Sequence, residues 1–105
     1  MVSRDTIEQI ARDIAAGFHA RQIILFGSYA RGDATENSDV DLLVVLDNPG
    51  PRGQRSAPIL RMVAERYELP VDVIVRSRAG FARWRQVPGS LAHQVSLEGV
   101  TLHAS

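Results

Sequence analysis

The hydrophobic positions near the start of the chain repeat with the period of a helix. They fall at i, i+3, i+7 and i+11 on Ile7, Ile10, Ile14 and Phe18, with Ala11 and Ala15 in the same stripe. Asp5 and Glu8 stand three residues apart ahead of this stripe and resemble a capping box. We therefore expect an amphipathic helix that begins near Asp5 and turns its apolar stripe toward a core.

Two short apolar runs predict the first strands. Residues 23 to 26 are continuously apolar and end at Gly27, which is typical of a buried strand that runs into a tight turn. A short helix is expected from Ser28 to Arg31, closed by Gly32 in the left-handed conformation. After a polar loop over 33–38, Val40 to Leu46 is predicted to be a central strand whose only interior charge is Asp41.

The middle of the chain contains its clearest loop, over residues 48–53, where proline and glycine are dense. A helix is expected from Ser56, as its N-cap, to about Glu68. The residues predicted to face the core are Leu60, Val63, Ala64 and Tyr67. Val71 to Val75 then predicts another strand, again with a single aspartate, Asp72.

The last third of the chain is predicted to be helical in two pieces, separated by Pro88-Gly89. The apolar residues are Phe81 and Trp84 in the first piece, and Leu91, Val95 and Leu97 in the second. Gly99 ends the second piece, and Val100 to His103 is expected to form a short edge strand. The order α-β-α-β-α-β-α-β indicates an α/β fold, with helices packed on a sheet in a single domain over residues 1–105.

Composition narrows the classes of function. Twelve arginines balance twelve acidic residues, and a neutral total disfavours direct nucleic-acid binding of the coat-protein kind. There is no cysteine, so disulfides and thiolate metal sites are excluded. No apolar run approaches the length of a membrane span, and we expect a cytoplasmic protein without a membrane anchor.

The charges are unevenly distributed along the neutral chain. Residues 33–47 hold five acids and no base, whereas residues 73–97 hold four arginines and no acid. The arginine stretch fits a solvated helix face, and it also fits a contact with an acidic surface of a partner or with nucleic acid.

Three aspartates are the candidate catalytic residues. Asp39 and Asp41 alternate along the predicted strand and should share one face, where they repel each other unless a cation lies between them. Asp72 is flanked by apolar residues, and burial there requires a partner. If the two strands are neighbours, the three carboxylates could hold one or two magnesium or manganese ions, with Asp72 free to accept a proton from an incoming hydroxyl.

The turn at Gly27-Ser28 is a candidate phosphate site. Here a strand gives way to a helix, whose first N–H groups lack partners and favour an anion. Gly27 lets a phosphate approach closely, and the Ser28 hydroxyl adds a donor. Phosphate oxygens beside three carboxylates indicate metal-assisted attack on the phosphorus of a nucleotide.

The run from Gly27 to Gly32 and the run from Ser38 to Leu42 together resemble the G-S-x-x-R-G…S-D-x-D-L signature of the minimal nucleotidyltransferases, in the polymerase-β-like superfamily. The resemblance implies a mixed sheet flanked by helices, two Mg²⁺ ions and ATP as the donor. By the same resemblance Asp39, Asp41 and Asp72 are catalytic metal ligands and Asp72 is also the general base. The nucleotide-binding residues that it implies are Gly27, Ser28, Arg31 and Ser38, with Arg31 either on phosphate or in a salt bridge to a site aspartate.

The resemblance also bears on the acceptor. Small members of this family are typically antitoxins paired with a HEPN-domain toxin, and the chain is similar to those that transfer AMP to a tyrosine hydroxyl of the toxin. The alternative is a non-catalytic nucleotide-binding module that neutralises its partner by occlusion. A homo-oligomer formed through the expected edge strand at 100–103 is a further possibility.

Overall fold

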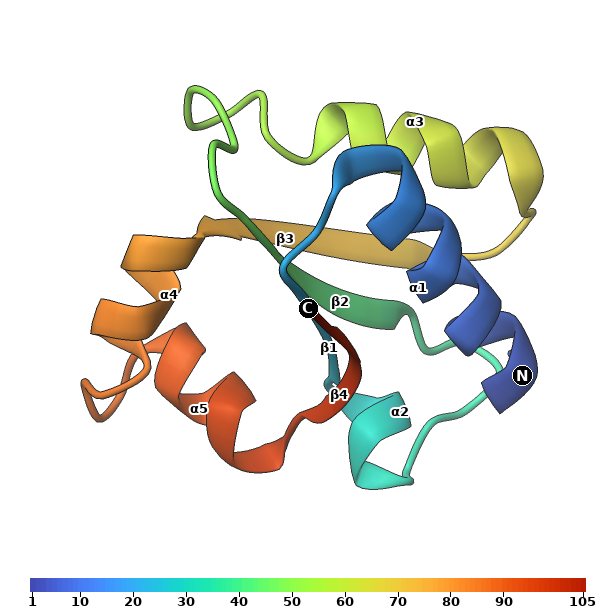
Figure 1. Ribbon diagram of the computed structural model, residues 1–105. Helices are drawn as coiled ribbons and strands as arrows, with labels where there is room; N and C mark the ends of the chain where they lie inside the picture. The colour runs from blue at the N-terminus through green and yellow to red at the C-terminus, as the bar shows by residue number, and fades with distance from the viewer.

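The fold is one four-stranded sheet between two layers of helices (Figure 1). The computed structural model describes all 105 residues. The helices are α1 (Arg4–Phe18), α2 (Ser28–Arg31), α3 (Ala57–Arg66), α4 (Arg78–Trp84) and α5 (Leu91–Glu98). The strands are β1 (Gln22–Phe26), β2 (Val40–Leu46), β3 (Val71–Ser77) and β4 (Val100–Ala104).

The sheet has the strand order β3-β2-β1-β4. β1 runs antiparallel to both β2 and β4, while β2 and β3 are parallel, so the sheet is mixed as the sequence predicted. The parallel pair needs a crossover, and α3 provides it on the upper side of the sheet in Figure 1. β3 and β4 are the two edges, which confirms the expected edge strand at the end of the chain.

Each face of the sheet has its own hydrophobic core. The larger cluster lies under α1 and α3 and takes alternate residues of the strands, among them Leu42 and Val44 of β2. The smaller cluster lies under α4 and α5 and takes the intervening residues of β2, Leu43 and Val45. Because side chains alternate along a strand, Asp41 belongs to the same face as Leu43, the face covered by α4 and α5.

The first helix begins earlier than its sequence predicted. Ser3 is the N-cap, with its side chain accepting a hydrogen bond from the Thr6 N–H, so the expected capping box of Asp5 and Glu8 is wrong. Serine and aspartate are comparable N-caps, and in this fold Ser3 makes the capping bond one turn before the apolar stripe. Glu8 instead pairs with Arg4 across one turn at 3.6 Å.

The crossover helix α3 is shorter than expected and is rotated. It ends at Arg66, before Glu68, and Ser56 precedes it in a helical backbone conformation that makes no side-chain cap. Ile59 and Val63 are its buried residues, whereas Ala64 is exposed, contrary to prediction. Branched Ile59 covers more sheet than an alanine, which fixes the rotation of the helix.

The second half of the chain departs from its predicted pattern at two apolar residues. Phe81 and Val95 are buried under the sheet, but Trp84 and Leu97 are 46% and 74% exposed. β3 also continues two residues beyond the predicted Val75, to Ser77, whose side chain caps α4 by accepting from the Gly80 N–H. None of the helices has the length and apolar composition needed to cross a membrane.

Candidate active site

Two of the predicted carboxylates meet across neighbouring strands. β2 and β3 pair in parallel with Asp41 opposite Asp72, so the two side chains leave the same face of the sheet side by side. On its other side Asp41 is opposite Phe26, the last residue of β1. Asp41 therefore lies at the centre of the site, between the strand that carries Asp72 and the strand that ends at Gly27.

The three aspartates differ in exposure. Asp41 is partly buried, while Asp39 and Asp72 are exposed. Asp39 lies one residue before β2 begins instead of inside the strand. The predicted burial of Asp72 is wrong, because β3 is an edge strand and its first residues reach past the helices that cover the sheet.

Electrostatics single out Asp41. Burial raises the pKa of its carboxyl, and the charges of Asp72 and Asp39 raise it further, while Arg31 acts in the opposite direction. The cause is the concentration of like charge on one end of the sheet face. A cation placed among these oxygens would remove the repulsion.

Gly27 lies against the carboxylate of Asp41. Its backbone angles are φ 71° and ψ −155°, a region essentially restricted to glycine. A β-carbon at residue 27 would overlap Oδ2 of Asp41. The single-turn helix α2 starts here without a side-chain cap, so the N–H groups of Ser28 and Tyr29 are left for a ligand.

A pocket of about 350 Å³ joins the turn to the carboxylate. Its lining includes Gly27, Ser28, Arg31 and Asp41, which the sequence predicted, and Gln94 and Glu98 of α5, which it did not. α5 approaches this closely because Gly99 packs on β1, where a β-carbon would overlap the Ile24 side chain and the Val95 carbonyl oxygen. In the sequence, only Gly99, directly after the helix, indicated that α5 packs this closely on β1.

Arg31 is held by acidic neighbours. Its guanidinium lies 3.4 Å from the Asp33 carboxylate and 3.7 Å from that of Glu98, and both contacts are partly exposed. The expected salt bridge of Arg31 to a site aspartate is absent, since its ion-pair partners are Asp33 and Glu98. The guanidinium still lines the pocket, so a phosphate could replace Glu98 as its partner.

Ser38 lies away from the pocket lining. Its hydroxyl accepts a hydrogen bond from the Thr35 N–H at 2.9 Å, and its own N–H donates to the Thr35 carbonyl at 3.1 Å. These bonds close the turn that leads into β2. The structure thus gives Ser38 a positioning contact with the loop before Asp39.

The residues present suit a divalent cation as ligands, although no three acidic or histidine side chains are already gathered into a metal site. The raised pKa of Asp41, caused by burial and by its acidic neighbours, marks an uncompensated cluster of hard oxygen donors. Asp41 and Asp72 would be the principal ligands, since their strands fix them side by side. Asp39 would complete the set from the flanking loop.

Comparison of sequences agrees with this chemistry. The sequence profile of the family described as "Nucleotidyltransferase domain" matches residues 6–94. A relative from Methanocaldococcus jannaschii, named as a protein adenylyltransferase, is 36% identical over 73 residues, which are 68% of this chain and 72% of the relative. The protein adenylyltransferase MntA of Thermococcus cleftensis is 44% identical over 48 residues, or 42% of this chain and 48% of MntA.

Comparison of structures gives the same fold. A toxin-antitoxin structure with AMP-PNP superposes with a TM-score of 0.69 at 22% identity, covering 93% of this chain and 73% of the other. A nucleotidyltransferase from Sulfolobus solfataricus superposes with a TM-score of 0.57 at 26% identity, covering 92% of this chain and 76% of the other. The mixed sheet and its flanking helices are therefore a known arrangement.

Proposed function

Because the chain belongs to the nucleotidyltransferase domain family, we propose that it transfers AMP from ATP, with magnesium, to a tyrosine hydroxyl of a HEPN-type toxin and so acts as the antitoxin. The observation that supports this most strongly is the close contact of Gly27 with Asp41, next to Asp72. Because of this contact, the residues that we propose bind phosphate lie next to those that we propose bind metal.

The turn at Gly27 binds and orients the donor. Free N–H groups at the start of α2 and the Ser28 hydroxyl donate to the phosphate oxygens of ATP. Without a side chain at residue 27, the phosphates can lie against the backbone directly above Asp41. Arg31 exchanges its partly exposed pair with Glu98 for a phosphate oxygen.

The three carboxylates divide the remaining work according to their exposure. Asp39, Asp41 and Asp72 would hold magnesium, with two ions expected from the family pattern, and the metal would supply positive charge against the phosphates. Asp72 is exposed on the edge strand, where an incoming hydroxyl can reach it. Asp72 accepts the hydroxyl proton as the oxygen bonds to the α-phosphorus, and pyrophosphate leaves.

Label transfer from ATP tests this function. The protein is incubated with ATP labelled at the α-phosphate, magnesium and the product of the neighbouring reading frame. Label should appear on the partner with the wild type and disappear with Asp41→Asn, because the amide removes a metal ligand while it preserves the shape of the side chain. Asp47→Asn, at the exposed end of β2, is the matched control and should retain transfer.

The same assay separates enzyme from binding module. If the verified partner is fully neutralised by both wild type and Asp41→Asn and neither transfers label, neutralisation is by occlusion and the proposed transfer is wrong. Mass spectrometry of the partner locates the modification. Transfer to a residue other than tyrosine would correct the acceptor and leave the reaction type intact.

A further inference from the structure

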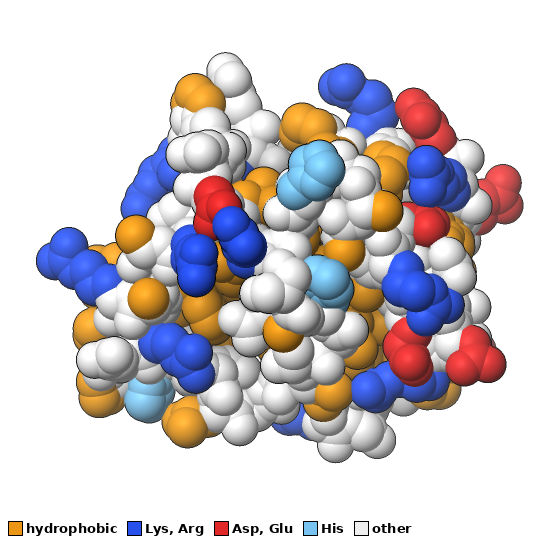
Figure 2. Space-filling model, in the orientation of Figure 1, with side chains coloured by type: hydrophobic (Ala, Val, Ile, Leu, Met, Phe, Trp, Pro, Cys, Tyr) orange, Lys and Arg blue, Asp and Glu red, His pale blue; other side chains and the backbone are white.

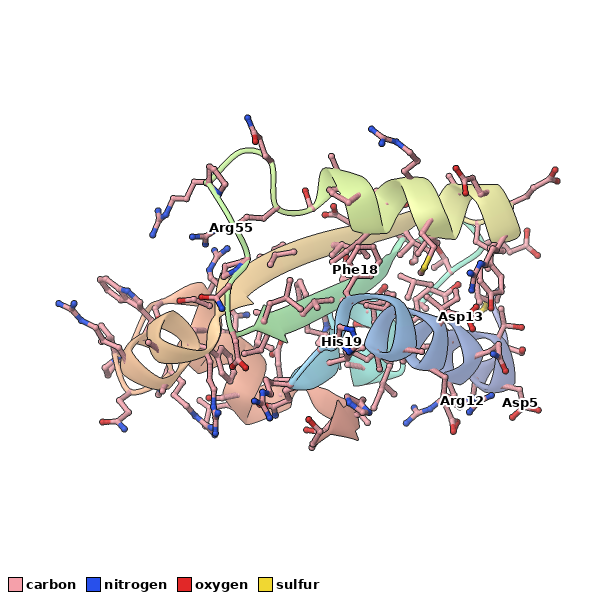
Figure 3. All side chains as sticks on the ribbon, turned by 45° about the horizontal axis from the view of Figure 1, so that its top comes forward. Asp5, Arg12, Asp13, Phe18, His19 and Arg55 are labelled. Atoms are coloured by element: carbon pink, nitrogen blue, oxygen red, sulfur yellow. The ribbon has the colours of Figure 1, made fainter.

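A second cavity lies beside the candidate active site. Its volume is about 610 Å³, and it is bounded by β3, the loop before α3, α4 and the start of α5. Three arginines line it: Arg52 and Arg55 from the loop and Arg76 from β3. Figure 3 shows Arg55 on the loop that leads from β2 into α3, near the end of β3.

The three arginines have no acidic partner. None of them forms an ion pair, although six other ion pairs occur in the molecule. Burial lowers the pKa of Arg76, and the charges of Arg52 and Arg55 lower it further. In Figure 2 arginines outnumber acids on the side of α4, whereas the two kinds alternate around α1. Such an uncompensated cluster is suited to binding an anion.

The cavity also lies along the unpaired edge of the sheet. β3 is an edge strand, and three consecutive residues of it, Val73, Ile74 and Val75, line the cavity. Consecutive side chains of a strand point to opposite faces, so a cavity lined by three consecutive residues lies along the edge of the strand, next to its backbone. The Val75 carbonyl accepts a bond from the side chain of Arg76 at 3.1 Å instead of from another strand.

Asp72 and Arg76 share one face of β3. They are four residues apart, which is about 13 Å along a strand. A peptide bound along this edge would have a similar rise per residue. If the hydroxyl of one peptide residue lies at Asp72, the side chain of the peptide residue four positions away therefore lies beside the arginines.

We propose that the cavity binds an acidic, extended segment of the protein acceptor, which pairs with the edge of β3 and places its carboxylates on Arg52, Arg55 and Arg76 and its hydroxyl at Asp72. The placement of the hydroxyl rests on the proposed function, whereas the binding of the acidic segment does not.

A polypeptide suits this cavity better than a second nucleotide. A free strand edge recognises a peptide backbone through its own N–H and C=O groups, and a nucleotide has no matching series. Trp84 could stack on a base, but the guanidinium of Arg83 already lies 5.6 Å from the centre of its ring. The phosphates of the donor also have their own site at Gly27.

A pair of labelled peptides tests the proposal. The acidic probe is a fluorescein-labelled Gly-Ser-Tyr-Ser-Glu-Ser-Glu-Ser-Gly, in which the glutamates stand two and four positions after the tyrosine, and the neutral probe has glutamine in both places. Fluorescence anisotropy with the wild type should show the acidic probe binding about tenfold more tightly or better, and the preference should fall as salt is raised.

Two triple variants of equal charge locate the site. Arg52→Gln, Arg55→Gln and Arg76→Gln together should remove the preference, whereas Arg4→Gln, Arg12→Gln and Arg61→Gln, all at exposed positions outside the cavity, should keep it. Circular dichroism confirms that both are folded. Equal preference in the two variants, or loss in both, would overturn the arginine cavity as the site.

Hydrogen exchange and competition test the binding mode. The acidic probe should slow amide exchange in residues 73–76 of the protein. The amides of the peptide alternate between those that face β3 and those that face away, so N-methylation of the first set should abolish binding and N-methylation of the second set should preserve it. AMP without metal should not displace the probe from the wild type; displacement by AMP would make this a nucleotide site and refute the proposal. If the probe binds as described but no acceptor protein is ever labelled by ATP, the proposed transfer fails and the cavity assignment stands.

Discussion

Gly27 and Asp41 are in contact across the ends of two antiparallel strands, with the Cα of the glycine against the carboxylate of the aspartate. This contact couples the turn that we propose binds phosphate to the strand that carries the proposed metal ligand Asp41. Its geometry depends on the missing side chain at residue 27 and on the register that places Asp41 opposite Phe26.

Replacement of Gly27 tests that contact directly. Gly27→Ala should abolish the stabilisation by ATP and magnesium, which for wild type at one hundred times the dissociation constant is about 2.7 kcal/mol. The β-carbon would displace Asp41, and the backbone strain would cost a further 1–3 kcal/mol, roughly, in the unliganded protein. Thermal melting with and without the ligands measures both effects.

Gly89→Ala is the control for backbone strain. Gly89 also has a positive φ, of 87°, but a β-carbon there would meet nothing within 4 Å. The variant should lose stability and keep the full shift with ATP. An unchanged ATP shift in Gly27→Ala would contradict the importance of the contact.

The negative charge of Asp41, a candidate metal ligand, should reduce the stability of the folded protein. Its pKa is raised, so the folded state binds the proton more tightly than the unfolded state, and this contribution to stability is lost as pH rises through the folded pKa. At neutral pH and without metal, Asp41→Asn should therefore have a free energy of unfolding larger than that of wild type by an amount on the order of 0.5 kcal/mol, and it should melt at a higher temperature. The difference should vanish below about pH 4.

Asp47→Asn should behave in the opposite way, because Asp47 is paired with Arg21 at 2.9 Å and its removal loses an attraction. Magnesium should raise the melting temperature of wild type and of Asp47→Asn but not that of Asp41→Asn. A lower melting temperature for Asp41→Asn than for wild type at neutral pH would refute the repulsion.

The contact between α1 and the end of α3 should make stability depend on acid pH. The Tyr67 hydroxyl donates to Asp13 at 2.6 Å, and this bond, with Gln9 and Arg66, outweighs burial and lowers the pKa of Asp13. A lowered pKa stabilises the fold above the unfolded value and is lost as pH falls through the folded value. Figure 3 shows Asp13 on the side of α1 that faces α3.

Tyr67→Phe should cost about 1–2 kcal/mol in the free energy of unfolding at pH 7, and less at an acid pH low enough to protonate Asp13, which lies below about pH 4 because the pKa of this carboxyl is lowered. Urea titrations at both pH values measure the difference. Tyr29→Phe is the matched control, since the Tyr29 hydroxyl accepts from the Val2 N–H at 3.1 Å and no carboxylate is involved. Its effect should be the same at both pH values.

Glu98 should oppose the binding of ATP. It lines the pocket proposed for the phosphates and pairs with Arg31 at 3.7 Å, so it would both repel a phosphate and occupy the guanidinium. Glu98→Gln should tighten ATP about twofold to fivefold, in keeping with a partly exposed ion pair worth about 0.2–1 kcal/mol. Calorimetric titration measures the affinity, and Glu8→Gln, which disrupts the pair of Arg4, should leave it unchanged.

The sequence was most informative where the signal is local. Strand 23–26 and the turn at Gly27 were predicted from a short apolar run and a glycine, and the structure confirms them. The start of α1 and the rotation of α3 were predicted wrongly, because several residues nearby satisfy the same capping and packing rules and only tertiary contacts choose among them. The prediction that Asp72 is buried was wrong for a related reason, since apolar neighbours in the sequence do not reveal that a strand lies at the edge of a sheet.

The sequence by itself determined most of the helices and strands, the candidate aspartates and the candidate phosphate turn, because helix and strand periods and turn chemistry act over a few residues. The tertiary structure decided that Asp41 and Asp72 are register partners, that Glu98 meets Arg31, and that three arginines from a loop and a strand line one cavity. Those relationships join residues far apart in the chain, and they follow from strand order and helix packing, which no local pattern encodes.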